Sequence, residues 1–366
     1  MKVHTSDKKR MLFFVLFSLI RIFADRMKQK VTIYPYIAYP KGEKANPYIY
    51  DFAAAVNATG EAMTLNEPSH NPLLSILPFK RWGDITVFNW FESIPDYIYG
   101  PLQATVAIFY TLLLKCTGRQ IIWILHNKKP HVTRYQWLKK LLTWYITHMA
   151  DLIVTHSTEG IRLLKEQYPY AVHKAHYISH PTKDRTSDQT ASKKYDLVVW
   201  GAITPYKGIV ELLEYLNRHS EFQPTLCIAG HCANQTLKAR IQSLLRPGID
   251  FIPEAMPFDT LQTLIAQSRY VLMPYQPETI LSSGILMDSL SFGAKIIGPN
   301  VGSFHDYSQE QLLKVYTFNT FDDLPAIMEQ HKDEEPSLTD YRSFLHQHDW
   351  NHFAHQILLL ANHPTK

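Results

Sequence analysis

The sequence is poor in cysteine, in glycine and in net charge, and each shortage excludes a class of protein. Three cysteines, none in a CxxC pair, cannot complete a disulfide framework, so we expect a chain that folds in a reducing compartment. Only 14 of 366 residues are glycine, which excludes collagen-like repeats. Basic residues exceed acidic ones by only 37 − 33 = 4, far from the positive field of a dedicated nucleic-acid binder.

The chain also lacks the two commonest phosphate-binding motifs. No GxGxxG follows a predicted strand and no GxxxxGK[ST] loop is present, so nicotinamide and P-loop chemistry are disfavoured. Hydrophobic residues nevertheless make up 46% of the chain, which excludes intrinsic disorder. The length predicts two domains, each with a sizeable core.

The N-terminal segment, residues 1–30, combines an apolar run with basic flanks. Residues 11–20 read MLFFVLFSLI and are bordered by Arg10 and Arg21. The run is shorter than the roughly 20 residues of a membrane span, and no small-residue cleavage site follows it. We expect an amphipathic helix that lies in the membrane interface with its cations on acidic headgroups. A helix packed on the first domain, or a true anchor, is the alternative.

From residue 31 onward, short apolar runs alternate with longer helical patterns, which is typical of an α/β protein with parallel sheets. The first series fills residues 31–181, with strands expected near 31–37, 84–89, 120–126, 151–155 and 175–179. Residues 182–194 contain no large apolar side chain, so we assign a linker to 182–195. A second series fills 196–345, and a C-terminal helix over 346–366 could pack back on the first domain.

Two turns of the second half are suited to binding phosphate. In the first, Gly201 ends a predicted strand, and Lys207 and Gly208 precede a helix, so that the ammonium lies near free amide groups and the helix dipole. A solvated lysine is the plainer interpretation of that position.

The second turn begins at Pro274 and ends at Ser282, Ser283 and Gly284, where small side chains permit close approach of a phosphate to the helix amides. Asp288, one helical turn further on, could accept hydrogen bonds from a ribose. Ordinary capping by the serines and a solvated Asp288 are the plainer interpretations.

In order and spacing these turns resemble the nucleotide-binding half of GT-B glycosyltransferases, especially family 4 and its relatives. The resemblance extends over residues 120–310 and includes Trp123 to Asn127, Ile228-Ala229-Gly230 and the run from Asp288 to Ile297. It implies two Rossmann-like domains that face each other across a cleft. The first would bind the acceptor and the second a nucleotide-diphosphate sugar.

The resemblance also implies which residues form the site. His126, Lys207 and Glu278 would be catalytic, and Asn127, Lys128 and His131 would face the acceptor. The nucleotide sugar would be bound by Gly201, Lys207, Gly208, Ser282, Ser283, Gly284 and Asp288. No cofactor and no metal are expected. His173, His176 and His180 have a ligand-like spacing, but without carboxylates to complete a site we expect solvated or capping histidines.

Two departures from the family pattern leave parts of the mechanism open. Ala202 stands where an arginine is usual, and Ile280 replaces the first glutamate of the E-x7-E pair, whose second member falls on Asp288. The resemblance implies retention of configuration. If the reaction inverts instead, the base must come from the first half, where Asp51, Glu92 and Asp96 occupy loop-like positions.

We therefore expect a glycosyltransferase that transfers a sugar to a glycan or lipid-linked saccharide, in bacterial surface polysaccharide synthesis. It would work in the cytoplasm, as a peripheral protein on the inner face of the cell membrane. A GT-B-like sugar-nucleotide epimerase and a catalytically silent sugar-nucleotide-binding protein are the alternatives.

Overall fold

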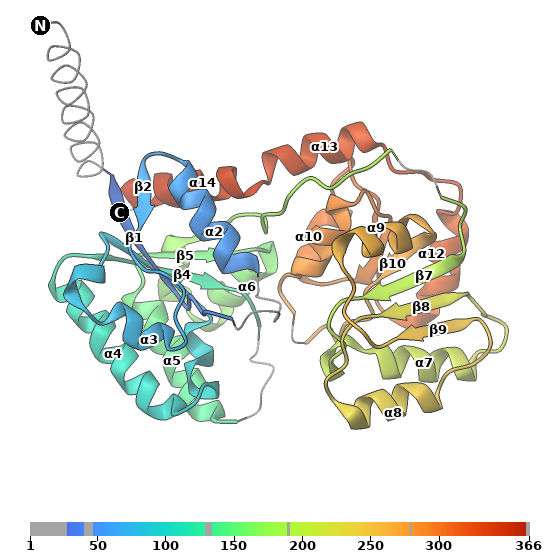
Figure 1. Cartoon of the computed structure of the whole chain (residues 1–366), viewed down its shortest axis with the longest axis horizontal. Helices are drawn as coiled ribbons and strands as arrows, with labels where there is room; N and C mark the ends of the chain where they lie inside the picture. The colour runs from blue at the N-terminus through green and yellow to red at the C-terminus, as the bar shows by residue number, and fades with distance from the viewer. Residues whose placement is uncertain (1–27, 40–46, 129–133, 189–190, 279, 364–366) are drawn as a thin grey trace, which may run out of the picture.

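The chain forms two α/β domains, each built on a six-stranded parallel sheet (Figure 1). A computed structural model describes residues 28–39, 47–128, 134–188, 191–278 and 280–363. The predicted N-terminal helix and His131 lie outside these residues. Within the described part of the chain, no helix is long and apolar enough to cross a membrane.

The first domain has the strand order β2-β1-β3-β4-β5-β6. The central strand β3 is buried at every position, which is the pattern of a parallel strand covered by helices on both faces. One face is covered by α2 and the other by α4 and α5. The strands are β1 (Gln29–Tyr34), β2 (Ala62–Thr64), β3 (Ile85–Asn89), β4 (Gln120–Leu125), β5 (Leu152–Thr155) and β6 (Ala175–Tyr177), and the helices are α2 (Pro47–Ala58), α3 (Pro72–Ile76), α4 (Gly100–Cys116), α5 (Gln136–Met149) and α6 (Thr158–Gln167).

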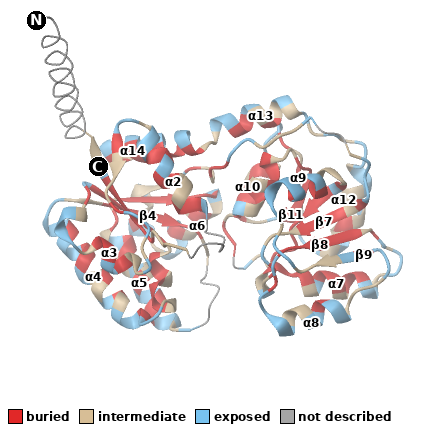
Figure 2. Cartoon of the chain, viewed as in Figure 1, coloured by how far each residue is buried: buried red, intermediate tan, exposed pale blue. Residues whose placement is uncertain are grey.

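The second domain has the strand order β12-β11-β10-β7-β8-β9. Its buried strands lie beneath helices with exposed outer surfaces (Figure 2). The strands are β7 (Tyr195–Trp200), β8 (Leu226–Ala229), β9 (Ile249–Ile252), β10 (Ser268–Leu272), β11 (Ile296–Pro299) and β12 (Val315–Phe318), and the helices are α7 (Ile209–Arg218), α8 (Gln235–Ser243), α9 (Phe258–Ala266), α10 (Gly284–Ser291), α11 (Gly302–Ser308), α12 (Leu324–Gln330) and α13 (Leu338–Gln347).

The C-terminal helix α14 (Trp350–Asn362) returns to the first domain. Phe353 and Ile357 of this helix lie in the same buried cluster as Phe52 of α2. The segment after β6 leads from the first domain to the second. In this segment Thr182 forms a parallel β-bridge with Asp349, the residue that precedes α14. The domains are therefore joined by two stretches of chain.

The prediction of an α/β chain with two Rossmann-like domains is confirmed by the two parallel sheets. Strands β2 and β12 were not predicted: each is an edge strand of three or four residues, too short for a clear pattern. Thr182, at the start of the predicted linker, is buried, with 3% of its surface exposed.

Candidate active site between the two domains

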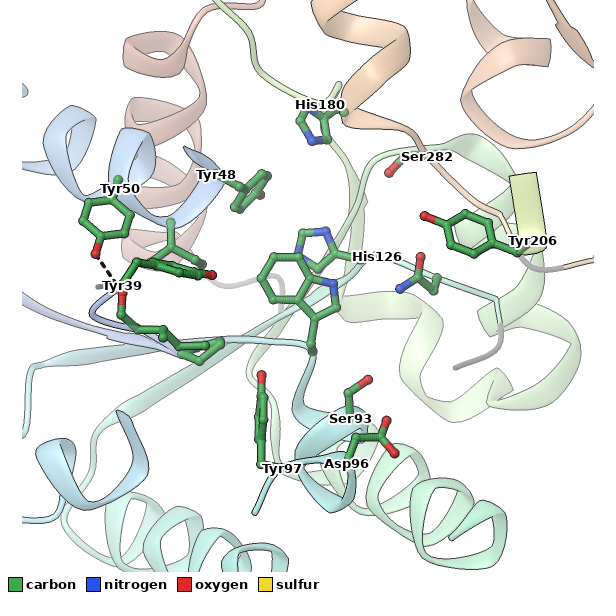
Figure 3. Close-up of a pocket in the computed structure, with 16 residues that line it drawn as sticks. Tyr39, Tyr48, Tyr50, Ser93, Asp96, Tyr97, His126, His180, Tyr206 and Ser282 are labelled. Atoms are coloured by element: carbon green, nitrogen blue, oxygen red, sulfur yellow. Dashed lines mark hydrogen bonds between the residues drawn. The ribbon is translucent and has the colours of Figure 1, made fainter. Parts of the chain in front are cut away.

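Two neighbouring cavities lie between the domains. The larger, of about 540 Å³, is lined mostly by the first domain, and the smaller, of about 310 Å³, lies over the beginning of α10. Figure 3 shows Asp96 on one side of the larger cavity, His180 and Ser282 on the other, and His126 between them. The two cavities adjoin each other, because both are lined by Tyr48, Asn127, His180, Tyr206, Ser282 and Gly284.

The beginning of α10 borders the smaller cavity. Ser283 is the N-cap residue, and its hydroxyl accepts a hydrogen bond from the amide of Leu286 at 3.3 Å. The first amides of a helix have no partner within the helix and carry the positive end of its dipole. Ser282 and Gly284 line the cavity beside them. This end of the cavity is therefore suited to an anion such as a diphosphate.

Lys207 lies behind this helix end, in the turn between β7 and α7. Its side chain is only 2% exposed, and its Nζ lies 3.4 Å from the carbonyl oxygen of Trp200 and over the ring of Tyr275. Burial without a facing carboxylate lowers its pKa to about 7.

Two glycines permit this arrangement. Gly201 has φ +93°, and a Cβ there would lie 3.1 Å from the Lys207 Nζ. Gly208 has φ +67°, and a Cβ there would lie 1.9 Å from the carbonyl oxygen of Pro274. Any larger residue at Gly208 would push the turn away from the strand end that leads to α10.

The lowered pKa of Lys207 predicts a pH dependence of nucleotide-sugar binding. A bound diphosphate favours the ammonium, so the pKa of Lys207 rises on binding. Affinity is then full below the free-state pKa of about 7 and is lost as the pH increases above it. We expect affinity to fall about tenfold between about pH 6 and pH 8, measured by calorimetry. The Lys207→Arg variant, charged throughout, should give a flat profile, and a flat wild-type profile would contradict this role.

Asp288 faces the smaller cavity but already has partners. Its Oδ1 accepts hydrogen bonds from Arg185 Nη1 at 3.1 Å and from Thr182 Oγ1 at 3.3 Å. Burial raises its pKa, and the nearby Arg185 guanidinium opposes that rise. One carboxylate oxygen is thus held by the interdomain segment, and the ribose contact of Asp288 stays a prediction.

We expect Asp288→Asn to weaken nucleotide binding by about 10- to 100-fold, since a hydrogen bond to a charged group is worth about 1.5–3 kcal/mol. The ribose contact is tested on the wild-type protein by comparing ribonucleotides with 2′,3′-dideoxynucleotides. Equal affinities for the two would show that Asp288 only holds Arg185 in place.

His126 lies at the end of β4 and lines the larger cavity. Its Nε2 is 2.9 Å from Asn89 Oδ1, and its ring stacks on Trp90 with a centroid distance of 4.3 Å. Burial lowers its pKa well below the usual value, and the neighbouring His156 and His180 lower it further. His126 is therefore neutral, and because Asn89 Oδ1 is an acceptor, its Nδ1 carries the lone pair.

His180 is placed in the same way. Its Nδ1 donates to the carbonyl oxygen of Pro181 at 2.9 Å, and burial lowers its pKa to about 4. The neutral ring therefore has an unprotonated Nε2, which lies close to Gly284. The expectation of a solvated or capping role for His180 is wrong, because the residue lines both cavities.

The three carboxylates considered as bases occupy different places. Asp96 lines the larger cavity, and its Oδ1 is 2.7 Å from Lys139 Nζ. Asp51 lines the smaller cavity and pairs with Lys183 at 2.7 Å. Glu92 is 5% exposed and does not line the larger cavity, and burial raises its pKa to about 7. Only Asp96 combines access to the larger cavity with a buried cation beside it.

Not every residue in the expected site faces the cavities. Asn127 does, but the Nζ of Lys128 is held by Glu159 at 2.6 Å and by the carbonyl oxygen of Pro277 at 3.0 Å. Glu278 is exposed and lines neither cavity, so its catalytic role stays a prediction. No group of three or more metal-binding side chains occurs among the described residues.

Tyr48, Trp90 and Arg185 are site residues that the sequence analysis missed. The Tyr48 hydroxyl is 2.8 Å from His156 Nε2, across 108 residues of chain. Trp90 has a left-handed backbone, with φ 49°, which is uncommon for a bulky residue and recurs at functional sites. None of the three lies in a motif, so only the folded chain shows their position.

The two facing domains and the cleft between them define a protein of the GT-B fold. Anabaena HepE in complex with UDP superposes with a TM-score of 0.62 at 12% identity, covering 92% of this chain and all of that one. AviGT4, a glycosyltransferase involved in avilamycin A biosynthesis, superposes with a TM-score of 0.59 at 14% identity, covering 92% and 98%. The expected GT-B architecture is confirmed.

In sequence, the chain is similar to two curated proteins of Xanthomonas campestris pv. campestris, each named GDP-mannose:glycolipid 4-beta-D-mannosyltransferase. They are 25% and 23% identical over 229 residues, which is 59% of this chain and 61% of each relative. No known family profile matches the chain. The chain thus has the GT-B fold and is related in sequence to glycosyltransferases.

Proposed function

We propose that the protein is a glycosyltransferase that moves mannose from a nucleotide-diphosphate mannose to a lipid-linked saccharide. The observation that carries this proposal is the pair of adjoining cavities, of which the smaller lies over the N-terminus of α10 and the larger is lined mostly by the first domain. The kind of donor and acceptor follows from the names of the two Xanthomonas relatives.

In this proposal the diphosphate lies at the beginning of α10, with the amides of Gly284 and Ile285 and the ammonium of Lys207 around it. These groups stabilise the charge that collects on the leaving group as the anomeric carbon gains oxocarbenium character. The chain's own cations perform this role, and no divalent ion is needed. Undiminished activity in excess chelator would support metal independence.

We propose that the reaction inverts the configuration, in place of the retention that the family 4 resemblance implies. The relatives are named for a β-linked product, and a nucleotide sugar with an α-linked mannose requires inversion to give one. The larger cavity supplies Asp96 as a base for the acceptor hydroxyl. The anomeric configuration of the product, read by NMR, decides between the two outcomes.

A place on the cytoplasmic face of the membrane, in the synthesis of a bacterial surface polysaccharide, completes the proposal. A glycolipid acceptor keeps its lipid in the bilayer while its saccharide enters the cavity. The apolar run at 11–20 and its basic flanks are suited to such an interface.

The test is incubation of the full chain with radiolabelled GDP-mannose and a bacterial lipid extract. Transfer of label to the lipid phase is expected, and GDP should be released in equal amount. A free altered sugar nucleotide would instead indicate an epimerase. Binding without turnover, across UDP, GDP, ADP and CMP sugars, would indicate a silent binding protein.

A further inference from the structure

Two neighbouring helices of the first domain expose an unusual number of large apolar side chains. Among the described residues, sixteen large hydrophobic side chains are exposed, and nine of them lie between Ile98 and Trp144. The whole second domain, residues 195–345, contributes only Phe258 and Leu312. Isolated apolar residues on a surface need no explanation, but a concentration of this kind marks an interaction surface.

These side chains form one stripe on each helix. On α4 they recur at helical spacing at Leu102, Phe109 and Leu113, and on α5 at Trp137, Leu141 and Trp144. The helices pack side by side, since the Tyr145 hydroxyl on α5 donates to the carbonyl oxygen of Ile108 on α4 at 2.9 Å. They cover the sheet face opposite α2 and α14 (Figure 1).

The α4–α5 surface carries exposed cations, although Lys115 pairs with Asp151 and the buried Lys139 pairs with Asp96. Residues 97–150 contain seven lysines and arginines and not one aspartate or glutamate. Lys140 is exposed on α5 between Trp137 and Trp144. Exposed aromatic and aliphatic side chains can be buried in a bilayer, and the cations among them are attracted to anionic headgroups. A protein partner would need acidic groups on a matching apolar patch, and nothing in the structure points to one.

The surface also adjoins the active site. The short 3-10 helix η2 (Phe91–Asp96) packs against both α4 and α5 and carries Ser93 and Asp96 into the larger cavity. Tyr97 lines that cavity, while the next two residues, Ile98 and Tyr99, are each 79% exposed at the beginning of α4. The exposed Ile98 and Tyr99 directly follow the cavity-lining Tyr97 in the sequence. A lipid bound at this surface would therefore lie close to the acceptor side of the cavity.

We propose that the α4–α5 surface docks on an anionic bilayer and presents the larger cavity to lipid-linked acceptors. Docking itself rests on the exposed side chains and their charge, whereas the delivery of acceptor rests on the proposed function. This contact is separate from the N-terminal segment, residues 1–30, which precedes the first domain in the sequence.

The chain contains its own reporter for this contact. Cys116 is exposed at the end of α4, one helical turn past Leu113, while Cys227 and Cys232 are buried. A polarity-sensitive dye on Cys116 of the full-length protein should shift to the blue and brighten severalfold on vesicles of phosphatidylglycerol and phosphatidylcholine. The control carries Cys116→Ser and Leu359→Cys. It places the dye on α14, where Leu359 is 50% exposed, and should not respond.

Substitution then tests the apolar stripes. Phe109→Glu with Trp144→Glu should weaken vesicle binding at least ~10-fold, because two large apolar groups are removed and two negative charges are added. Leu359→Glu should not weaken it. A Cys116 signal that stays unchanged while the protein floats with vesicles would overturn the proposal, as would equal responses on pure phosphatidylcholine. A signal that rises with protein concentration without lipid would instead indicate a second copy of the chain.

Activity on a water-soluble saccharide acceptor separates the two proposals. The double variant should keep wild-type rates on that acceptor and lose them only on the lipid-linked one. If the dye on Cys116 reports docking but the wild-type protein transfers no sugar to either acceptor, the proposed glycosyltransferase function is wrong while the docking proposal is still supported.

Discussion

Lys207→Ala is expected to lower kcat by ~10²- to 10³-fold, the usual loss when one preorganised electrostatic contact is removed. The Nζ is buried, has no carboxylate partner among the residues that the structure describes and lies beside the helix end where the diphosphate would bind. Its main hydrogen bond, to the Trp200 carbonyl oxygen, is long at 3.4 Å. The contacts of this amine are therefore weak, although Lys207 lines neither cavity and a diphosphate would have to reach its Nζ past the beginning of α10.

Because Lys207 is buried, a loss of activity in its variants can be distinguished from a loss of folding. Because burial disfavours the charged amine, removing it should not lower thermal stability, and Lys207→Met keeps most of the side-chain volume. We expect both variants to melt at or above the wild-type temperature while losing activity. Lys207→Arg should retain part of the rate. Full activity in Lys207→Met would remove the lysine from the mechanism.

The sequence predicts the second domain's turns well, because their chemistry is local. Glycine must occupy the left-handed positions 201 and 208, and a small polar residue must cap α10, so these residues mark their own structure. The same local reasoning found most strands, whose apolar runs are buried on both faces. The bounds of these strands differ from the expected ones by up to three residues, as at β1, which was expected over 31–37 and extends over Gln29–Tyr34.

The acceptor side could not be predicted to the same extent, because its side chains come from distant segments. Tyr48 meets His156 only after the sheet has formed. Lys128 reads as a cationic rim residue, yet its partner Glu159 lies at the beginning of a helix that follows another strand. Asp288 reads as a solvated or ribose-binding residue, but Arg185 arrives from the interdomain segment to meet it. Pairings of this kind cannot be predicted from the spacing of residues along the sequence.

If the reaction inverts, Asp96→Asn should have the largest effect of any substitution on the acceptor side, a fall in kcat of ~10²- to 10⁴-fold. The Asp96 side chain keeps 20% of its surface exposed while lining the larger cavity, and the Nζ of Lys139, which is 2% exposed, lies 2.7 Å from its Oδ1. The second oxygen can then accept the proton of the acceptor hydroxyl as that oxygen attacks the anomeric carbon. Donor affinity should change little, because the proposed diphosphate position, at the beginning of α10, is at the other end of the site.

A lost rate alone could also reflect the Lys139 ammonium left without its partner. Azide separates the two explanations, since it attacks the donor without needing a base, and the nucleoside diphosphate leaves. Asp96→Asn with azide should therefore form a β-mannosyl azide and recover turnover, while the folded fraction, followed by thermal unfolding, stays unchanged. An α-linked product from the wild type, or azide rescue in Asp51→Asn or Glu92→Gln but not in Asp96→Asn, would place the base elsewhere. Rescue confined to position 96 would show that Asp96, in the larger cavity, activates the acceptor.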